Sequence, residues 1–253
     1  FIYNVFKPSI LCYFEIIKTY YATIMYLKKF VFFSSQAAAG PANLEMPISE
    51  DNPPAPITNY GKSKLAAENY LLDIQSKLKF EILIIRPPAV FGPFEKDIYT
   101  YFKMINSGLT ILSGAGDLKF SIIYVKDLVK ATILLAETKN LILNTLTATS
   151  PIFFLSDSKY YSVKEFCELI AEQLNKKTIK INIPIFLIKI FGLINDCISK
   201  IFKKTMLLTS DKLNEISCKY WLCSNQKFLN LFPTFQFTSP KIAISETIES
   251  YRN

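Results

Sequence analysis

The chain of 253 residues contains no histidine. This absence excludes Ser-His-Asp and Cys-His catalysis, zinc sites with histidine ligands and histidine proton relays. Acid/base chemistry must therefore fall to tyrosine, lysine, aspartate, glutamate or cysteine. The five cysteines are odd in number and match no metal-ligand spacing. We therefore predict no metal site, and we expect free thiols in a reducing compartment, the cytoplasm.

Charge and hydropathy argue against two further classes of protein. The formal charge is +8, from 29 basic and 21 acidic residues, but the lysines are spread along the chain. A nucleic-acid-binding face would need them clustered, so we expect no nucleic-acid partner. The apolar stretch at 10–33 is interrupted by Glu15, Lys18, Lys28 and Lys29. We therefore expect no membrane span.

The first candidate site residues are Tyr60 and Lys64. Their i, i+4 spacing puts both side chains on one face of a helix, one turn apart. An ammonium group beside a tyrosine favours the phenolate and lowers its pKa from a reference near 10. Bringing that pKa to about 7 takes about 4 kcal/mol. Ser35 follows an apolar strand and could hydrogen-bond the same substrate oxygen. Such a pair is also common on exposed helix faces, so its surroundings matter.

Three stretches around the pair share one pattern. They read Lys29-Phe-Val-Phe-Phe-Ser-Ser-Gln-Ala-Ala-Ala-Gly-Pro41, Asn59-Tyr-Gly-Lys-Ser-Lys-Leu-Ala-Ala-Glu68 and Ile84-Ile-Arg-Pro-Pro-Ala-Val-Phe-Gly-Pro93. Together they resemble the extended short-chain dehydrogenase/reductase family, also called the NAD-dependent epimerase/dehydratase family. The resemblance runs from Asn4 to Tyr251. Its specific part is the Ser/Tyr/Lys spacing combined with Arg-Pro-x-x-Val-Phe-Gly-Pro.

The resemblance implies an α/β fold, a partial Rossmann-like doubly wound parallel sheet with a smaller C-terminal substrate-binding domain. Residues 1–93 and 120–155 would belong to the NAD(P)-binding domain, and residues 94–119 and 156–253 to the substrate-binding part. The family begins with a strand, a Gly-x-x-Gly-x-x-Gly turn and a helix that hold the dinucleotide pyrophosphate. None of the seven glycines makes this pattern. We therefore expect an N-terminally truncated member whose first βαβ units are missing.

The same resemblance assigns roles to individual residues. Tyr60 would be the general acid/base, and Lys64 would bind the nicotinamide ribose and lower the pKa of Tyr60. Ser35 would orient the reacting oxygen, with Ser34 as the alternative. Hydride would pass between the substrate carbon and the nicotinamide of NAD or NADP. The cofactor-binding residues would be Tyr60, Lys64, Pro87, Pro88 and Val90.

Two departures from the family pattern bear on the substrate. Gln36-Ala37 stand where the sugar-nucleotide 4,6-dehydratases of the family carry Asp-Glu, which argues against dehydration. Pro87-Pro88 stand where sugar-nucleotide epimerases usually carry an asparagine that touches the substrate diphosphate. This pattern is closer to the sterol-dehydrogenase-like and dihydroflavonol-reductase-like branches.

We therefore predict an oxidoreductase for a secondary alcohol or ketone in a small-molecule substrate. A sugar-nucleotide epimerase of the same family is the alternative. A hypothesis of another class is a non-catalytic truncated remnant that lacks the dinucleotide-binding turn. Family members often pair through the helix that would carry Tyr60, so the resemblance also implies a homodimer as an option.

Residue patterns predict the order of the elements. Strands are predicted at 29–33, 80–85, 120–125 and 151–155, and helices at about 5–21, 60–77, 97–108, 128–137, 163–174, 184–203 and 239–251. Asp127 is predicted to be the N-cap of helix 128–137. Helix 184–203 is apolar apart from one charged stripe. Such a helix can lie on a membrane surface, although packing on a core is commoner.

Overall fold

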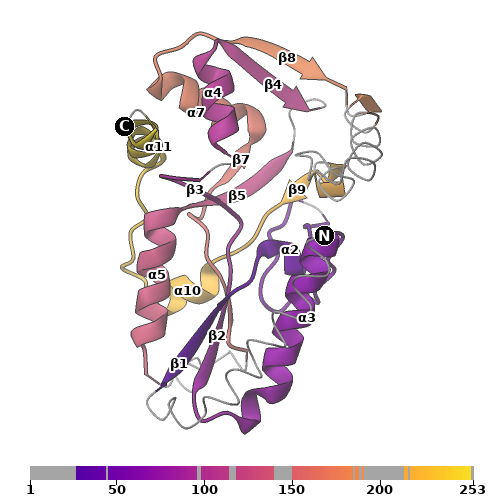
Figure 1. Ribbon diagram of the computed structural model, residues 1–253, viewed down its shortest axis with the longest axis vertical. Helices are drawn as coiled ribbons and strands as arrows, with labels where there is room; N and C mark the ends of the chain where they lie inside the picture. Colours follow the sequence, from indigo (N-terminus) through magenta and orange to yellow (C-terminus); the bar gives the residue numbers. More distant parts are fainter. Residues whose placement is uncertain are drawn as a thin grey trace, which may run out of the picture.

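A computed structural model describes residues 27–43, 45–95, 98–113, 118–139, 150–184, 186–187, 190, 214–215 and 217–251. Strands and helices alternate along much of this chain (Figure 1). The strands are β1 (Lys29–Phe33), β2 (Glu81–Arg86), β3 (Ala89–Phe91), β4 (Leu109–Ser113), β5 (Lys119–Tyr124), β6 (Ile152–Phe154), β7 (Tyr160–Ser162), β8 (Ile179–Ile183) and β9 (Tyr220–Trp221). The helices are α2 (Gln36–Ala39), α3 (Asn59–Ile74), the 3-10 turn η1 (Gln75–Lys77), α4 (Tyr99–Asn106), α5 (Val125–Glu137), α7 (Val163–Gln173), α10 (Gln226–Leu231) and α11 (Pro240–Ser250).

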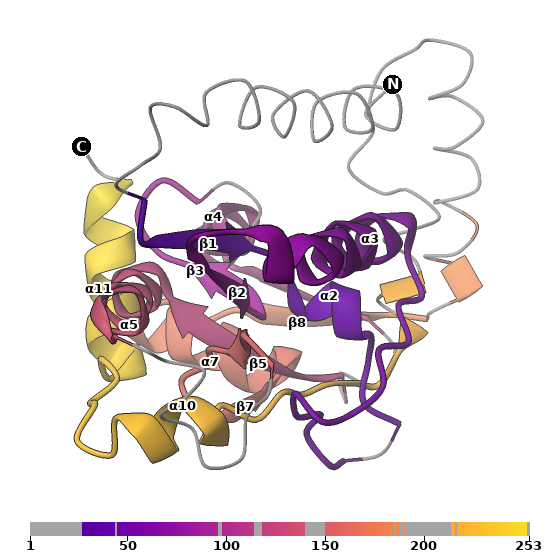
Figure 2. The same ribbon diagram turned by 90° about the horizontal axis from the view of Figure 1, so that it is seen from below.

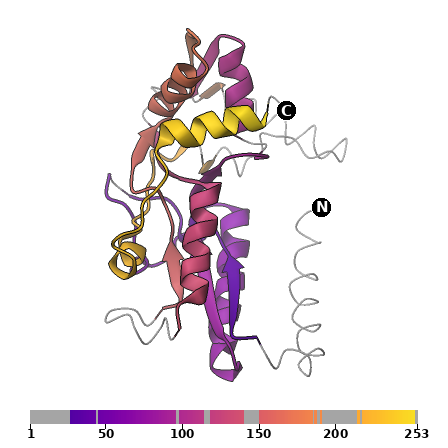
Figure 3. The same ribbon diagram turned by 90° about the vertical axis from the view of Figure 1, so that its left-hand side faces the viewer.

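A parallel three-stranded sheet in the order β1-β2-β6 forms one half of the molecule. Its central strand β2 is buried from Ile82 to Arg86. Because successive side chains of a strand point to opposite faces, this apolar run needs cover on both sides. Ile82 and Ile84 pack with Leu71 of α3, whereas Leu83 and Ile85 pack with α5 and α10. Figure 2 shows α5 and α3 on opposite sides of β1 and β2, and in the view of Figure 3 α5 lies in front of these strands and α3 behind them. The fold is therefore α/β and Rossmann-like, as predicted.

A second assembly is built on β5. This strand pairs in parallel with β3 and β9 and antiparallel with β7. Helices α4, α7 and α11 pack with it through an aromatic cluster that includes Phe91, Phe102 and Phe166. Strands β4 and β8 form a separate parallel pair at the end of the molecule farthest from β1 (Figure 1).

Most of the predicted elements are confirmed within the described residues. The strands at 29–33, 80–85, 120–125 and 151–155 and the helices at 60–77, 97–108, 163–174 and 239–251 are present, with ends that shift by a few residues. Ser162 and Glu165 form the capping box of α7. The predicted helix at 5–21 lies outside the described residues, as does nearly all of helix 184–203. None of the described helices has the length and hydropathy needed to cross a membrane.

The predicted role of Asp127 is wrong. Helix α5 begins at Val125 directly after β5, and its N-cap is Tyr124, so Asp127 lies inside the first turn. The buried carboxylate of Asp127 accepts hydrogen bonds from the backbone N–H and the hydroxyl of Thr238, at 2.7 and 2.8 Å. No loop residue separates β5 from α5, so Asp127 is not at the N-cap position of its own helix. Its carboxylate instead binds the segment that precedes α11.

Candidate active site

Ser34 and Ser35 follow the carboxyl end of β1 and have different surroundings. Ser34 is buried, and its hydroxyl donates to the carboxylate of Glu68. Ser35 is half-buried, and its Oγ accepts a hydrogen bond of 3.1 Å from the backbone N–H of Ala37, as the N-cap of α2. That bond uses a lone pair and leaves the Ser35 proton available to an external oxygen.

Tyr60 and Lys64 lie in the first two turns of α3, as their spacing predicts. The Tyr60 side chain is 51% exposed. The Lys64 Nζ donates to the carbonyl oxygen of Phe33 at 2.9 Å and lies 5.8 Å from the centre of the Tyr60 ring. Lys64 therefore links the last residue of β1 to the tyrosine. Partial burial lowers the pKa of Lys64, and the Glu68 carboxylate opposes that shift.

A close backbone contact sets the distance between α2 and α3. Gly61 lies so near α2 that a Cβ added to it would be 2.2 Å from the carbonyl oxygen of Ala37. The buried Thr58 fixes the start of α3 by accepting a hydrogen bond of 3.0 Å from the Gly61 N–H. Since Ala37 follows Ser35 by two residues and Gly61 follows Tyr60 directly, the contact brings the Ser35 and Tyr60 segments together.

The predicted cofactor-binding residues that follow β2 differ in their burial and in their contacts. Pro87 is buried, and its carbonyl oxygen accepts a hydrogen bond of 2.9 Å from the backbone N–H of Gln36. This bond ties the end of β2 to the end of β1, next to Ser35. Pro88 is half-buried. Val90 packs on the apolar cluster on the α5 side of the sheet.

A buried ion pair beneath the site was missed in the sequence. Arg86 donates from Nε and from its terminal nitrogen to the two carboxylate oxygens of Glu68, at 3.0 and 2.5 Å. Both side chains are almost completely buried. A charge at the end of a continuous apolar strand requires a partner, and this was the signal that could have revealed the pair.

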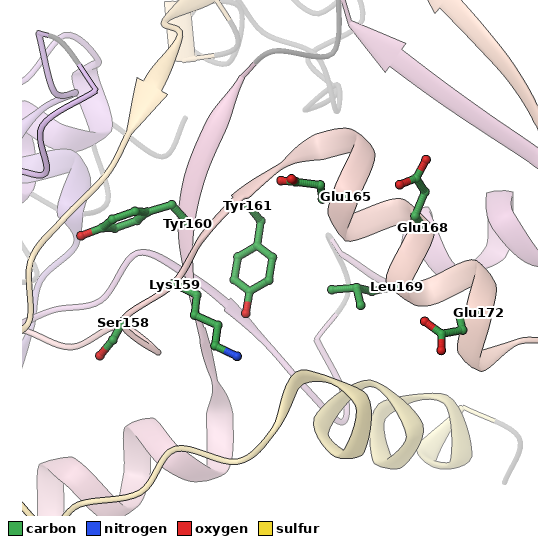
Figure 4. Close-up of a pocket in the computed structure, with 8 residues that line it drawn as sticks. All are labelled: Ser158, Lys159, Tyr160, Tyr161, Glu165, Glu168, Leu169 and Glu172. Carbon is green, nitrogen blue, oxygen red and sulfur yellow. The ribbon is translucent and has the colours of Figure 1, made fainter.

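The described residues also form a hollow of about 690 Å³ between β7 and α7. Figure 4 shows that its wall carries Glu165, Glu168 and Glu172 along α7. These carboxylates already have partners: Glu165 caps α7, Glu168 pairs with Lys180, and Glu172 pairs with Lys241.

None of the predicted site residues lines this hollow. Beside it, burial raises the pKa of Asp157 to about 6, while the hydroxyl of Tyr161 donates to that carboxyl group at 2.7 Å.

Among the described residues, no three histidine, cysteine, aspartate or glutamate side chains gather closely enough to hold a metal ion. Cys167, Cys218 and Cys223 are free thiols, whereas Cys12 and Cys197 lie outside the described part of the chain.

Two curated proteins with sequences similar to this chain are 4-epimerases. The chain is 28% identical over 169 residues to a UDP-glucose 4-epimerase of Vibrio cholerae, covering 66% of this chain and 49% of that protein. It is 29% identical over 192 residues to the N-acetyl-alpha-D-glucosaminyl-diphospho-ditrans,octacis-undecaprenol 4-epimerase of Escherichia coli O157:H7, covering 75% and 55%. The chain thus spans about half the length of these curated relatives.

Solved structures share the fold. The UDP-glucuronic acid 4-epimerase of Bacillus cereus, in complex with UDP-glucuronic acid and NAD, has a TM-score of 0.66 at 17% identity, over 90% of this chain and 62% of that chain. The dTDP-glucose 4,6-dehydratase of Bacillus anthracis, in complex with NAD, has a TM-score of 0.67 at 16% identity, over 94% and 64%. The model of the NAD dependent epimerase/dehydratase family matches residues 17–144, about half of the chain. The chain belongs to the NAD dependent epimerase/dehydratase family.

Proposed function

We propose that this chain carries the acid/base residues of an NAD- or NADP-dependent epimerase that inverts a hydroxyl-bearing carbon of a sugar nucleotide. The observation that carries the proposal is the position of Lys64. Its ammonium group lies between the end of the strand that leads to Ser35 and the ring of Tyr60. This arrangement supports Tyr60, Lys64 and Ser35 as a catalytic set. It argues against the alternative that Tyr60 and Lys64 are simply two neighbours on an exposed helix face.

Inversion at a carbon that bears a hydroxyl group requires that its C–H bond break and re-form on the other face. Oxidation to the ketone and reduction back achieve this, and each step moves one proton and one hydride. Tyr60 takes the hydroxyl proton and later returns it. Lys64 favours the phenolate of Tyr60, and Ser35 donates a hydrogen bond to the reacting oxygen. The same residues serve a simple oxidation, in which the second hydride transfer is absent.

The residues present fit the nicotinamide end of a dinucleotide. Lys64 has three N–H donors, and the Phe33 carbonyl takes one of them, so the others can bind ribose hydroxyl groups. Pro88, half-buried after β2, would form part of the wall beside the ring. The bound cofactor would supply the hydride acceptor. We propose no residue of this chain as a ligand of the dinucleotide pyrophosphate, because the sequence contains no glycine-rich turn of the pattern that binds it.

The relatives favour epimerisation over the sterol-type oxidation that the sequence favoured. Both curated relatives described above are 4-epimerases, and their names specify a nucleotide or diphospho-linked sugar. Gln36 and Ala37 are buried and carry no carboxylate, so they offer no acid for dehydration. Pro87 is buried as well, so a substrate diphosphate would be bound elsewhere, in the part predicted to hold the substrate. A homodimer through α3 remains a prediction.

A substrate panel tests the proposal. The protein, expressed from its complete reading frame, is incubated with NAD or NADP and with UDP-glucose, UDP-glucuronic acid, UDP-N-acetylglucosamine, a 3β-hydroxysteroid or a simple secondary alcohol. We expect the C4 epimer of a sugar nucleotide, detected by NMR, without net accumulation of reduced cofactor. Net reduction of the cofactor by the steroid or the alcohol would identify a dehydrogenase instead. Cofactor binding without any turnover would favour the non-catalytic alternative.

A further inference from the structure

Strands β4 and β8 present apolar side chains to solvent. In their parallel register Leu109 is paired with Ile179, and Ile111 is paired with Ile181. These four side chains are 37%, 70%, 39% and 43% exposed, and together they are called the β4–β8 apolar face. The alternate residues of β4, Thr110 and Leu112, are buried on the side where α4 and α7 contact the strand. The pleat of the pair therefore directs its apolar row away from the core.

Further apolar side chains are exposed after β8. Phe186, Leu187 and Ile190 are 58%, 37% and 48% exposed. Figure 1 shows β8 at one end of the molecule, leading away from the helices that pack on β4. Exposed apolar side chains that follow one another in this way are typical of an interaction surface.

The chain segment that contains β8 is basic. From Asn175 to Asn195 the sequence contains four lysines and no acidic residue. Lys176 and Lys177 are exposed directly before β8, and neither makes an ion pair with a described residue. Lys180 is neutralised by Glu168 of α7 at 2.5 Å. The β4–β8 apolar face is therefore bordered, at the start of β8, by two lysines that make no ion pair with a described residue.

This charge distinguishes the candidate partners. A second copy of the chain docked face to face would bring its lysines against the same lysines, which opposes association. An anionic lipid surface offers phosphate groups to the lysines and an acyl boundary to the aliphatic side chains. The described helices do not span a membrane, so such binding would be peripheral.

We propose that the β4–β8 apolar face, with Lys176 and Lys177 at its border, docks the protein on an anionic membrane surface. The proposal does not depend on the proposed epimerase activity. It concerns the end of the molecule farthest from the sheet that carries Ser35, so docking would leave the candidate active site unobstructed (Figure 1).

Vesicle binding tests the proposal. The purified chain is sedimented with vesicles of phosphatidylcholine alone and of phosphatidylcholine with phosphatidylglycerol. We expect binding to the anionic vesicles only, weakened by salt. The pair Ile179→Thr and Ile181→Thr keeps β-branched residues in the strand and should weaken binding by about tenfold. The pair Lys176→Gln and Lys177→Gln should weaken it by about fivefold per lysine.

A matched control is the pair Val129→Thr and Ile133→Thr on α5, where both residues are 49% exposed. This control should bind as the original chain does, and circular dichroism confirms that each variant is folded. Absence of binding to anionic vesicles, or an equal loss in the α5 control, would overturn the proposal. So would self-association in analytical ultracentrifugation that disappears in the β8 variant, because the face would then bind a second copy.

Discussion

At the scale of single residues, the pair of Glu68 and Arg86 determines how the sheet meets the candidate active site. Arg86 ends β2 and Glu68 lies in α3, so their two hydrogen bonds join strand and helix. Ser34 donates to the same carboxylate. This network occupies Ser34 in the interior and leaves Ser35, the next residue, for the proposed contact with the reacting oxygen. The ion pair therefore gives two adjacent serines different surroundings.

We expect the substitution Glu68→Gln to lower the free energy of unfolding by about 3–5 kcal/mol. The change leaves the Arg86 charge buried without a counter-charge, and an uncompensated buried charge is costly. Urea denaturation at constant pH measures the effect. The matched control is Glu172→Gln, which breaks the exposed pair with Lys241 and should cost less than about 1 kcal/mol.

A second variant keeps this prediction falsifiable. The double substitution Glu68→Leu with Arg86→Met removes both charges and should recover part of the lost stability, because no buried charge remains. Equal losses in Glu68→Gln and Glu172→Gln would show that the buried pair contributes no more than a surface pair.

At the scale of elements, the important contact is the one between α2 and α3. The pattern of residues predicted α3 correctly, because the spacing of apolar residues along a helix is a local signal. The contact at Gly61 could not be predicted in the same way. A glycine inside a helix indicates that something approaches closely, but only the folded chain shows that it is the Ala37 carbonyl. Asp127 illustrates the same limit, since its partner Thr238 is distant in sequence.

The substitution Gly61→Ala should therefore destabilise the protein by about 1–3 kcal/mol. Alanine favours a helix by about 1 kcal/mol over glycine, so local propensity predicts the opposite sign. The added Cβ must push α2 away, which also moves Ser35 relative to Tyr60. Thermal unfolding and turnover measure the two effects. Ser63→Ala, an exposed change in the same helix, is the control and should leave both nearly unchanged. A Gly61→Ala protein as stable and active as the original would contradict the close contact.

At the scale of the whole molecule, the sequence predicted the α/β class and the parallel sheet to which β1 and β2 belong. Continuous apolar runs such as Ile82–Ile85 are typical of strands covered on both faces, and the structure confirms this. The order of the strands could not be derived, because β6 pairs with β2 from far along the chain. The division into a cofactor-binding and a substrate-binding part remains a prediction. The activity of the whole protein is a proposal, since the chain spans about half of its curated relatives.

The most direct test of the central proposal is the substitution Tyr60→Phe in the protein expressed from its complete reading frame. The change removes only the hydroxyl group that is proposed to exchange the proton. We predict that kcat for the epimerised sugar nucleotide falls by about 10²–10⁴, while the dissociation constant of the dinucleotide stays within about twofold. Lys62→Gln, an exposed neighbour in α3, is the control and should keep full activity. Turnover retained by Tyr60→Phe would contradict the assignment of Tyr60 as the acid/base residue.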